Sequence, residues 1–282
     1  MFWVNSIRQD KQAADFIRRL FGLKRKTVYY TDEHSDEFSR VKITPKKIDG
    51  SYDYFLSSPK KTFLRFFFQR IIAAPCAFFY MKLMFARRTV GKDRLKPYRR
   101  VGFFLYGNHT HEIGDACNPK TLVFPKDAYT LVHAANVSMP LLGRITPYLG
   151  AIPLPDSMAA YRSFTDVISR RIGEGGCVVI YPEAHIWPYH TGIRSFPDTS
   201  FYYPASLAAP VFCFTNTYHK RSPFGVKIIT YVDGPFFPDE SLNIRERARD
   251  LRDRVFTAMN KRARSSTLTL IEYVKKENES LD

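Results

Sequence analysis

Short apolar runs alternate with amphipathic segments through the second half of the chain. Ser157 caps a predicted helix that ends at Gly173, and Asn243 with Glu246 forms a capping box for a second, long helix. Strands are predicted at 101–106, 129–133, 177–181, 210–215 and 226–232, where apolar residues follow one another. Because strands alternate with helices, the pattern predicts an α/β fold, with a mixed, largely parallel sheet flanked by helices.

Local patterns predict three further elements. Residues 5–22 carry apolar positions at helical spacing, which indicates an amphipathic helix. Residues 27–58 are polar and irregular, and we expect a surface excursion there. Asn118 followed by Pro119 indicates the start of a helix, with Asn as the cap and Pro in the first turn.

Residues 59–100 combine aromatic bulk with positive charge. Twelve Lys and Arg side chains stand in this stretch against one acid, Asp93. Its longest uncharged run, Ile71–Met81, has eleven residues, whereas a helix that crosses a bilayer needs about 20. The pattern favours a helix that lies in the membrane interface, bent into two short arms at Pro75. The alternative is an ordinary core helix with solvated charged ends.

The net charge of +16 favours polyanionic partners. Nucleic acid is not expected, because the usual nucleic-acid-binding signatures are not visible and the basic residues stand beside large apolar side chains. The four cysteines, at 76, 117, 177 and 213, form no C-x-x-C pair. This spacing indicates neither a zinc knuckle nor a disulfide framework, and free thiols in a reducing compartment are expected. The first residues do not have the pattern of a signal peptide.

The loop that follows the first predicted strand, in "FFLYGNHTHEIGDAC", carries candidate chemistry. A His beside a carboxylate is the arrangement of a general base, because the carboxylate fixes the imidazole tautomer and stabilises the imidazolium. His111 and Asp115 would share a face only in a helix, whereas His109 could reach Asp115 through a turn at Gly114. Because the helix is expected to start only at Asn118, we favour His109.

Two other interpretations of this loop stay open. The polar residues could be making local hydrogen bonds only. Alternatively, His109, His111, Glu112 and Asp115 could bind a metal ion, although no further ligand set is evident.

Three motifs in order carry a resemblance to a known family. "GNHTHEIGDA", "YPEA" and "APVFCF" resemble the N-H-x-x-x-x-D, F-P-E-G and P-V blocks of the glycerolipid acyltransferase superfamily, lysophosphatidate acyltransferase type. The resemblance covers about residues 100–232. It implies an acyltransferase domain at 100–282, preceded by a membrane-docking helical region at 1–99.

The resemblance also implies roles for individual residues. His109 would be the base and Asp115 its orienting carboxylate, while Asn108 and Glu183 would belong to the substrate-binding part of the site. In acyl transfer, attack on a thioester carbonyl creates an oxyanion, and we expect backbone amides near Glu183 and Ala184 to stabilise it.

The sequence departs from the family pattern in four places. Five residues separate His109 from Asp115 where the family has four, and Ala184 and His185 stand where the family has Gly and Thr or Ser. Pro155 stands where the family has an arginine that contacts the acceptor phosphate. Arg194 or Arg144 would have to replace that arginine.

The expected activity is transfer of a fatty acyl group from acyl-CoA or acyl-carrier protein to a hydroxyl of a lysophospholipid such as lysophosphatidate. Neither a metal nor a cofactor is expected to take part. The protein would be a peripheral, monotopic membrane protein on an anionic surface at the cytoplasmic face. A metal-dependent hydrolase and a membrane-binding protein without catalysis are the alternative functions.

Overall fold

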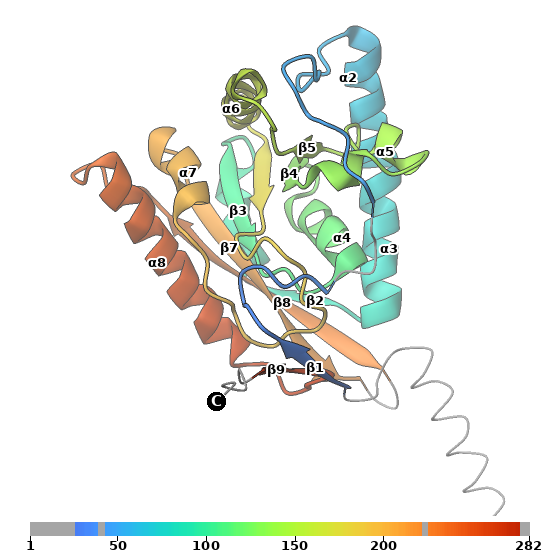
Figure 1. Cartoon of the computed structure of the whole chain (residues 1–282), viewed down its shortest axis with the longest axis vertical. Coiled ribbons are helices and arrows are strands. Elements are labelled where there is room, and N and C mark those ends of the chain that lie inside the picture. Colours follow the sequence, from blue (N-terminus) through green and yellow to red (C-terminus); the bar gives the residue numbers. More distant parts are fainter. Residues whose placement is uncertain (1–25, 39–42, 222–224, 277–282) are drawn as a thin grey trace, which may run out of the picture.

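The central feature of the computed structural model, which describes residues 26–38, 43–221 and 225–276, is a seven-stranded sheet (Figure 1). Its order is β2-β8-β7-β3-β6-β4-β5. Neighbouring strands are parallel except for β7 and β8, which are antiparallel. The strands are β2 (Arg88–Val90), β3 (Phe103–Gly107), β4 (Ala128–Val132), β5 (Ala151–Pro153), β6 (Cys177–Ile180), β7 (Val211–Lys220) and β8 (Val226–Phe236). The predicted mixed, largely parallel sheet is confirmed.

Helices cover both faces of this sheet because its central strands are apolar on both sides. Phe104 and Tyr106 of β3 pack in a core shared with helices α6 (Met158–Gly173) and α8 (Ile244–Ala263). Their neighbours Phe103 and Leu105 point to the other face and pack with helix α4 (Glu112–Val123). The connections hold the shorter helices η2 (Lys92–Tyr98), η3 (Ala134–Val137), α5 (Leu142–Ile145), η4 (Thr199–Phe201) and α7 (Tyr202–Ser206). The result is a sheet between two helical layers.

The two predicted helix caps are confirmed. The Ser157 hydroxyl accepts the Ala160 N–H at 3.2 Å, and Asn243 Oδ1 accepts the Glu246 N–H at 3.0 Å. The predicted helix at residues 5–22 lies outside the described residues.

The predicted helix start at Asn118 is wrong, since α4 begins at Glu112 with His111 as its cap and contains Pro119. Proline lacks the N–H that would bond the carbonyl of Asp115, four residues earlier. The hydroxyl of Tyr181 donates to that carbonyl instead. This distant partner lets the helix continue through the proline.

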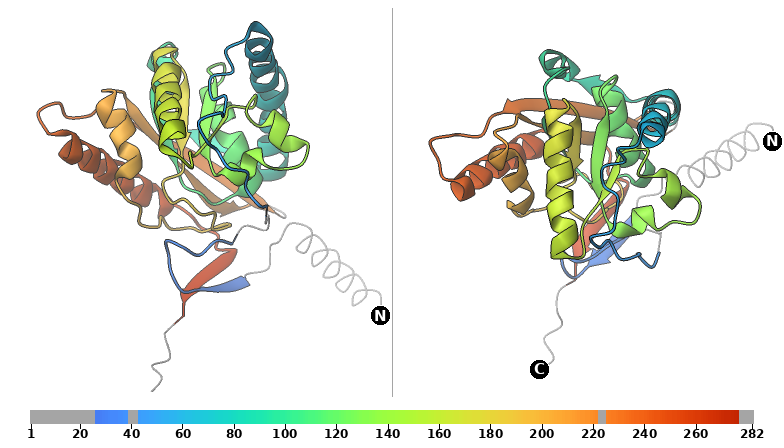
Figure 2. Two further views of the ribbon diagram at one scale, coloured as in Figure 1. Left: turned by 45° about the horizontal axis from the view of Figure 1, so that its top comes forward. Right: turned by 90° about the horizontal axis from the view of Figure 1, so that it is seen from above.

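The predicted surface excursion at 27–58 is wrong in part. Strand β1 (Lys26–Tyr30) pairs in parallel with β9 (Ile271–Lys275), and Figure 2 shows this pair lying apart from the central sheet. Ile48 and Tyr54 are buried in the main core. The partner of β1 lies more than 240 residues away in the sequence, so a local pattern could not reveal the strand.

Residues 59–85 form one uninterrupted helical run, so the prediction of two arms is wrong. It consists of α2 (Pro59–Phe66), the π-helical segment η1 (Phe67–Ala73) and α3 (Ala74–Phe85). The Ala74 N–H bonds the Gln69 carbonyl, five residues back. Pro75 has no backbone N–H to donate within the helix, and the wider turn directly before it accommodates this loss.

The same helix leaves much of its apolar surface exposed. Among the described residues it is the one helix that is long and apolar enough to span a membrane, judged by length and composition alone. The uncharged run of eleven residues, predicted to be too short to cross, is part of a helix of 27 residues, Pro59–Phe85, so length does not exclude a crossing. Nine large apolar side chains project from it: Phe63, Phe66, Phe67, Ile71, Ile72, Phe78, Phe79, Leu83 and Met84. This exposure supports membrane association rather than an ordinary core helix.

Candidate active site

The candidate site forms where two loops meet at the carboxyl ends of β3 and β6 (Figure 1). The loop after β3 carries His109, and the loop after β6 carries Glu183. Main-chain hydrogen bonds join them: Trp187 N–H donates to the His109 carbonyl at 3.1 Å, and Tyr189 N–H donates to the Thr110 carbonyl at 2.8 Å. Parallel strands bring these loops together because their carboxyl ends lie at one edge.

His109 and Asp115 form a hydrogen-bonded pair, which we call the dyad. Nδ1 of His109 lies 2.9 Å from Oδ2 of Asp115. The Asp115 side chain is buried, whereas 17% of the His109 side chain is exposed. Because Nδ1 is engaged by the carboxylate, Nε2 is the ring nitrogen left to exchange a proton with a substrate.

Two neighbours fix the dyad in place. The ring of Tyr181 stacks on that of His109, with 4.5 Å between ring centroids and 22° between planes. Oδ2 of Asp115 also accepts the backbone N–H of His111 at 2.9 Å. The dyad therefore forms without the turn at Gly114 that we expected, because α4 itself delivers Asp115 to His109.

His111 has a structural role in this geometry. Its Nδ1 accepts the Gly114 N–H at 2.9 Å, which caps α4, and its ring packs edge-on against Phe85 and Tyr189. Burial lowers the pKa of His111. These contacts favour His109 as the base.

Glu183 reaches the dyad from the second loop. The backbone of His109, 74 positions earlier in the chain, lies close enough to the Glu183 carboxylate to favour the charged form. Oε2 also lies 3.2 Å from Nη2 of Arg194, and both side chains are buried. Oε1 of Glu183 has no hydrogen-bond partner among the described residues.

Arg194 is enclosed on all sides in this structure. Besides Glu183, it donates to the His185 carbonyl and, at 3.2 Å, to the Glu33 carbonyl, and its guanidinium lies 4.7 Å from the ring centroid of Trp187. The segment of residues 31–38 covers this loop, since Trp187 Nε1 donates to the Asp36 carbonyl at 2.9 Å. The Arg194 guanidinium therefore pairs with Glu183, and in this arrangement it is not accessible to the phosphate of an acceptor.

The two remaining candidates are Asn108, directly before His109, and Arg144 on α5. Both polar atoms of the buried Asn108 side chain bond the main chain of Asn216 on β7, at 2.8 and 3.0 Å. This pairing anchors the loop that carries His109. Arg144 is exposed on α5, and within the described part of the chain it makes no hydrogen bond or ion pair with the dyad.

Of the backbone amides expected to stabilise the oxyanion near Glu183 and Ala184, that of Ala184 already has a hydrogen-bond partner. Ala184 adopts a left-handed conformation with φ of 63°. Its N–H donates to the Tyr181 carbonyl at 3.2 Å, and the next N–H, of His185, donates to the Glu183 carbonyl at 2.8 Å. Both amides are occupied within their own turn.

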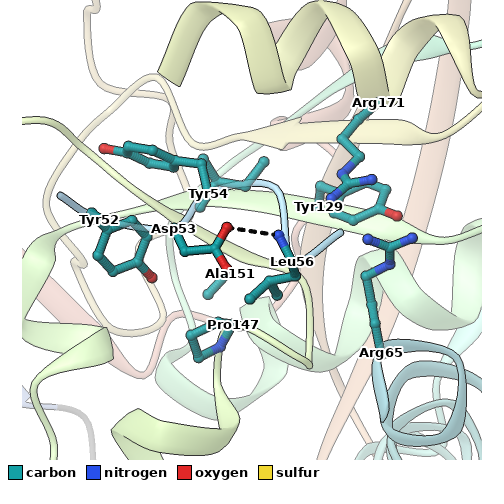
Figure 3. Close-up of a pocket in the computed structure, with 10 residues that line it drawn as sticks. Tyr52, Asp53, Tyr54, Leu56, Arg65, Tyr129, Pro147, Ala151 and Arg171 are labelled. Carbon is teal, nitrogen blue, oxygen red and sulfur yellow. Dashed lines mark hydrogen bonds between the residues drawn. The ribbon is translucent and has the colours of Figure 1, made fainter. Parts of the chain in front are cut away.

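Figure 3 shows a separate cavity, between β4, β5 and the segment 52–56. Arg65 and Arg171 both face the ring of Tyr129 there. Its volume of about 10 Å³ is room for a single water molecule. Tyr129 stands near the amino end of β4, whereas the dyad follows the carboxyl end of β3, so this cavity is not part of the candidate site.

A metal-binding cluster is absent from the described residues. Across 26–38, 43–221 and 225–276, no three His, Cys, Asp or Glu side chains are placed to hold a metal ion. In the loop proposed above as a metal site, the Nδ1 atoms of His109 and His111 both have hydrogen-bond partners from the protein. A four-ligand set of His109, His111, Glu112 and Asp115 is not assembled.

Sequence reasoning missed Tyr181, Trp187 and Asn216. Tyr181 was visible as the residue before Pro182 and Glu183, at the end of an apolar run. Trp187 and Asn216 carried no local signal, because their roles depend on contacts with chain segments that are distant in sequence.

Comparison with known proteins supports the fold. No model of a protein family matches the sequence, and a search of curated proteins finds no match. Among solved structures, the chain is similar to the 1-acyl-sn-glycerophosphate (LPA) acyltransferase PlsC from Thermotoga maritima. The TM-score is 0.51 at 14% sequence identity, and the match covers 74% of this chain and 84% of that one. The two chains share a fold, although their sequence identity is low.

The electrostatics of Glu183 give a testable pH dependence. Burial raises the pKa of Glu183 from 4.5 to about 7, although Arg194 and His109 act in the opposite direction. Between pH 4.5 and 7, the unfolded carboxyl is ionised while the folded one keeps its proton. The free energy of unfolding should therefore fall as pH rises through this window, by up to about 1.4 kcal/mol per pH unit.

The Glu183→Gln variant keeps the volume and cannot titrate, so this component of the pH dependence should vanish. Urea unfolding of both proteins from pH 4 to pH 8 measures it. Parallel curves for wild type and variant would show that Glu183 titrates normally in the folded protein.

Proposed function

We propose that the chain is an acyltransferase that moves a fatty acyl group from an acyl thioester to a hydroxyl of a lysophospholipid. The observation that carries the proposal is the His109–Asp115 pair, at 2.9 Å, at the carboxyl edge of the sheet. The distant likeness in fold to an LPA acyltransferase supports it. Donor and acceptor follow from the resemblance of the motifs, with lysophosphatidate as the first acceptor to test.

The reaction requires no acyl-enzyme. Nε2 of His109 takes the proton of the acceptor hydroxyl as its oxygen attacks the thioester carbonyl, and Asp115 stabilises the imidazolium. The tetrahedral intermediate then collapses, the carbon–sulfur bond breaks, and the thiolate takes the proton from His109. The products are the acylated lipid and a free thiol, of coenzyme A or of acyl-carrier protein. Both donors are anionic, which suits a net charge of +16.

The helix at 59–85 would place the His109–Asp115 pair next to the membrane that contains the lysophospholipid. Its carboxyl end reaches the site, since the ring of Phe85 lies 4.7 Å from that of His111, measured between centroids. We propose that the helix lies in the interface of an anionic membrane, at the cytoplasmic face, where the acyl thioesters are available. A lysophospholipid in the same leaflet would then have a short path to His109.

Lipid profiling tests the proposed activity. Wild type and His109→Ala would be expressed in cells, and the lysophospholipids and phospholipids of both would be measured by mass spectrometry. Purified protein with acyl-CoA and with acyl-carrier protein then identifies the donor. Identical lipid profiles, together with no transfer by the purified wild type, would exclude the proposal.

Membrane docking gives a second prediction. Replacing the exposed Phe63, Phe79 and Leu83 by Ser should weaken binding to vesicles that contain acidic lipid by at least about tenfold, because burying one such side chain contributes about 1.5–3 kcal/mol. Replacing the exposed Lys60, Lys82 and Arg88 by Ser should reduce binding mainly at low salt. Co-sedimentation with acidic and neutral vesicles measures both effects.

The matched control replaces Ile244, which is exposed at the start of α8, by Ser. It removes apolar surface outside the helix and should leave vesicle binding unchanged. Equal binding of all variants would show that the helix face is an ordinary exposed surface.

A further inference from the structure

Asn216, in the middle of β7, holds the loop of His109 through its main chain. Its N–H donates to Oδ1 of Asn108 at 2.8 Å, and its carbonyl accepts from Nδ2 of Asn108 at 3.0 Å. Asn108 is the residue directly before His109. This two-point contact therefore fixes where the histidine leaves the strand.

The side chain of Asn216 holds the other half of the dyad. Its Oδ1 accepts from Nδ2 of Asn118 at 2.7 Å and from the hydroxyl of Thr230 at 2.8 Å. Asn118 lies on α4 three residues after Asp115, so both side chains stand on one face of that helix. The contact fixes the position of α4 relative to β7.

A third contact sets the orientation of the Asn118 amide. Arg87 donates from Nη1 to Oδ1 of Asn118, which leaves Nδ2 to face Asn216. Arg87 follows α3 directly after Ala86. The chain of contacts thus runs from the end of the exposed apolar helix to the dyad.

We propose that Asn118 and Asn216 are positioning residues, which together hold Asp115 against His109. The inference rests on the proposed function, because it assigns these residues to the same reaction. Asn108, Asn118 and Asn216 are 1%, 0% and 3% exposed. Such buried amides contribute little net stability compared with well-packed apolar side chains. Their hydrogen bonds do fix the positions of two segments that lie 98 and 108 residues from Asn216 in sequence, those of Asn118 and Asn108. General-base catalysis requires the base and its carboxylate to be held in a fixed geometry.

The test is Asn118→Leu, which has a similar volume and neither polar atom. We expect kcat to fall by roughly 10- to 100-fold, as expected for a displaced catalytic pair, with KM for both substrates nearly unchanged. Thr217→Val is the matched control, because Thr217 is the next residue of β7, is fully buried, and bonds the Ile229 carbonyl at 3.0 Å. It should lose comparable stability and keep its kcat.

A double-mutant cycle separates positioning from a general loss of stability. If Asn118 acts through Asp115, then Asn118→Leu should lower kcat little further in an Asp115→Asn background. A full additional loss in that background would overturn the inference. If Asn118→Leu does not fold, Asn118→Asp takes its place, since it keeps the shape and the acceptor for Arg87 but replaces the Nδ2 donor by a carboxylate oxygen that faces Oδ1 of Asn216.

Nuclear magnetic resonance gives a readout that does not depend on activity. In protein labelled with ¹⁵N-histidine, the Nδ1–H proton of His109 should carry the downfield signal of a hydrogen bond to a carboxylate. We expect that signal to shift or vanish in Asn118→Leu and to persist in Thr217→Val. An unchanged signal in Asn118→Leu contradicts the inference. If the variants show the expected signals but the wild type transfers no acyl group, the proposed function alone is contradicted.

Discussion

Replacing His109 by alanine should lower kcat for acyl transfer by roughly 10²- to 10⁴-fold, the range expected for a lost general base. The imidazole is the one group of the dyad that reaches solvent, with 17% of its side chain exposed. It also lies in a loop, so its removal should leave the fold intact. Steady-state kinetics with acyl-CoA or acyl-carrier protein, together with a thermal melt, measure both quantities.

His111→Ala is the matched control for this variant. It removes an imidazole two residues away that caps α4 and packs against Phe85. We expect it to lower the melting temperature, by loss of a cap and of packing, and to reduce kcat much less. Full activity in a folded His109→Ala protein, or a larger loss of kcat in His111→Ala, would show that His109 is not the base.

The parts of the fold that could be predicted are those with a local cause. The strands around Phe104 and Val178 are continuous apolar runs, because the sheet is buried on both faces. The helix starts at Ser157 and Asn243 follow from side-chain caps within three residues. In each case the deciding contacts lie within a few positions of one another.

The parts that could not be predicted depend on distant partners. Pro119 indicated a helix start, yet α4 runs through it because Tyr181 supplies the hydrogen bond that proline cannot. Glu183 had no visible reason to be buried until Arg194 and the backbone of His109 lay beside it. Asn216 carries no motif, and its role follows only from where β7 lies relative to β3 and α4.

The spacing of the dyad illustrates both cases. The sequence has one more residue between His109 and Asp115 than the family pattern, which left the pairing open. In the structure His109 and Thr110 precede the cap of α4, and Asp115 lies in its first turns. The helix therefore turns the carboxylate back toward the loop, and the contact of 2.9 Å is made despite the extra residue.

Asp115→Asn should lower kcat by roughly 10²- to 10⁴-fold, and the structure indicates why. Oδ2 of Asp115 accepts from both His109 Nδ1 and the His111 backbone N–H. Because the His111 N–H can only donate, it favours the amide oxygen of Asn at this position. The hydrogen bond to His109 would then survive, and the loss would reflect the missing charge that stabilises the imidazolium. The opposite orientation would place the amide N–H₂ against Nδ1 and fix the wrong tautomer, at the larger end of the range.

Asp233→Asn is the control for a lost carboxylate, since Asp233 pairs with Arg262 of α8 and makes no contact with the dyad. It should keep wild-type kcat and lose some stability, because it leaves Arg262 unpaired. Asp115→Asn should lower kcat and cost less stability, because among the described residues Asp115 has no Lys or Arg partner that would be left unpaired. Kinetics at several pH values and urea unfolding compare the two variants. A folded Asp115→Asn protein with full activity would show that His109 needs no carboxylate, and the dyad would then be a structural contact.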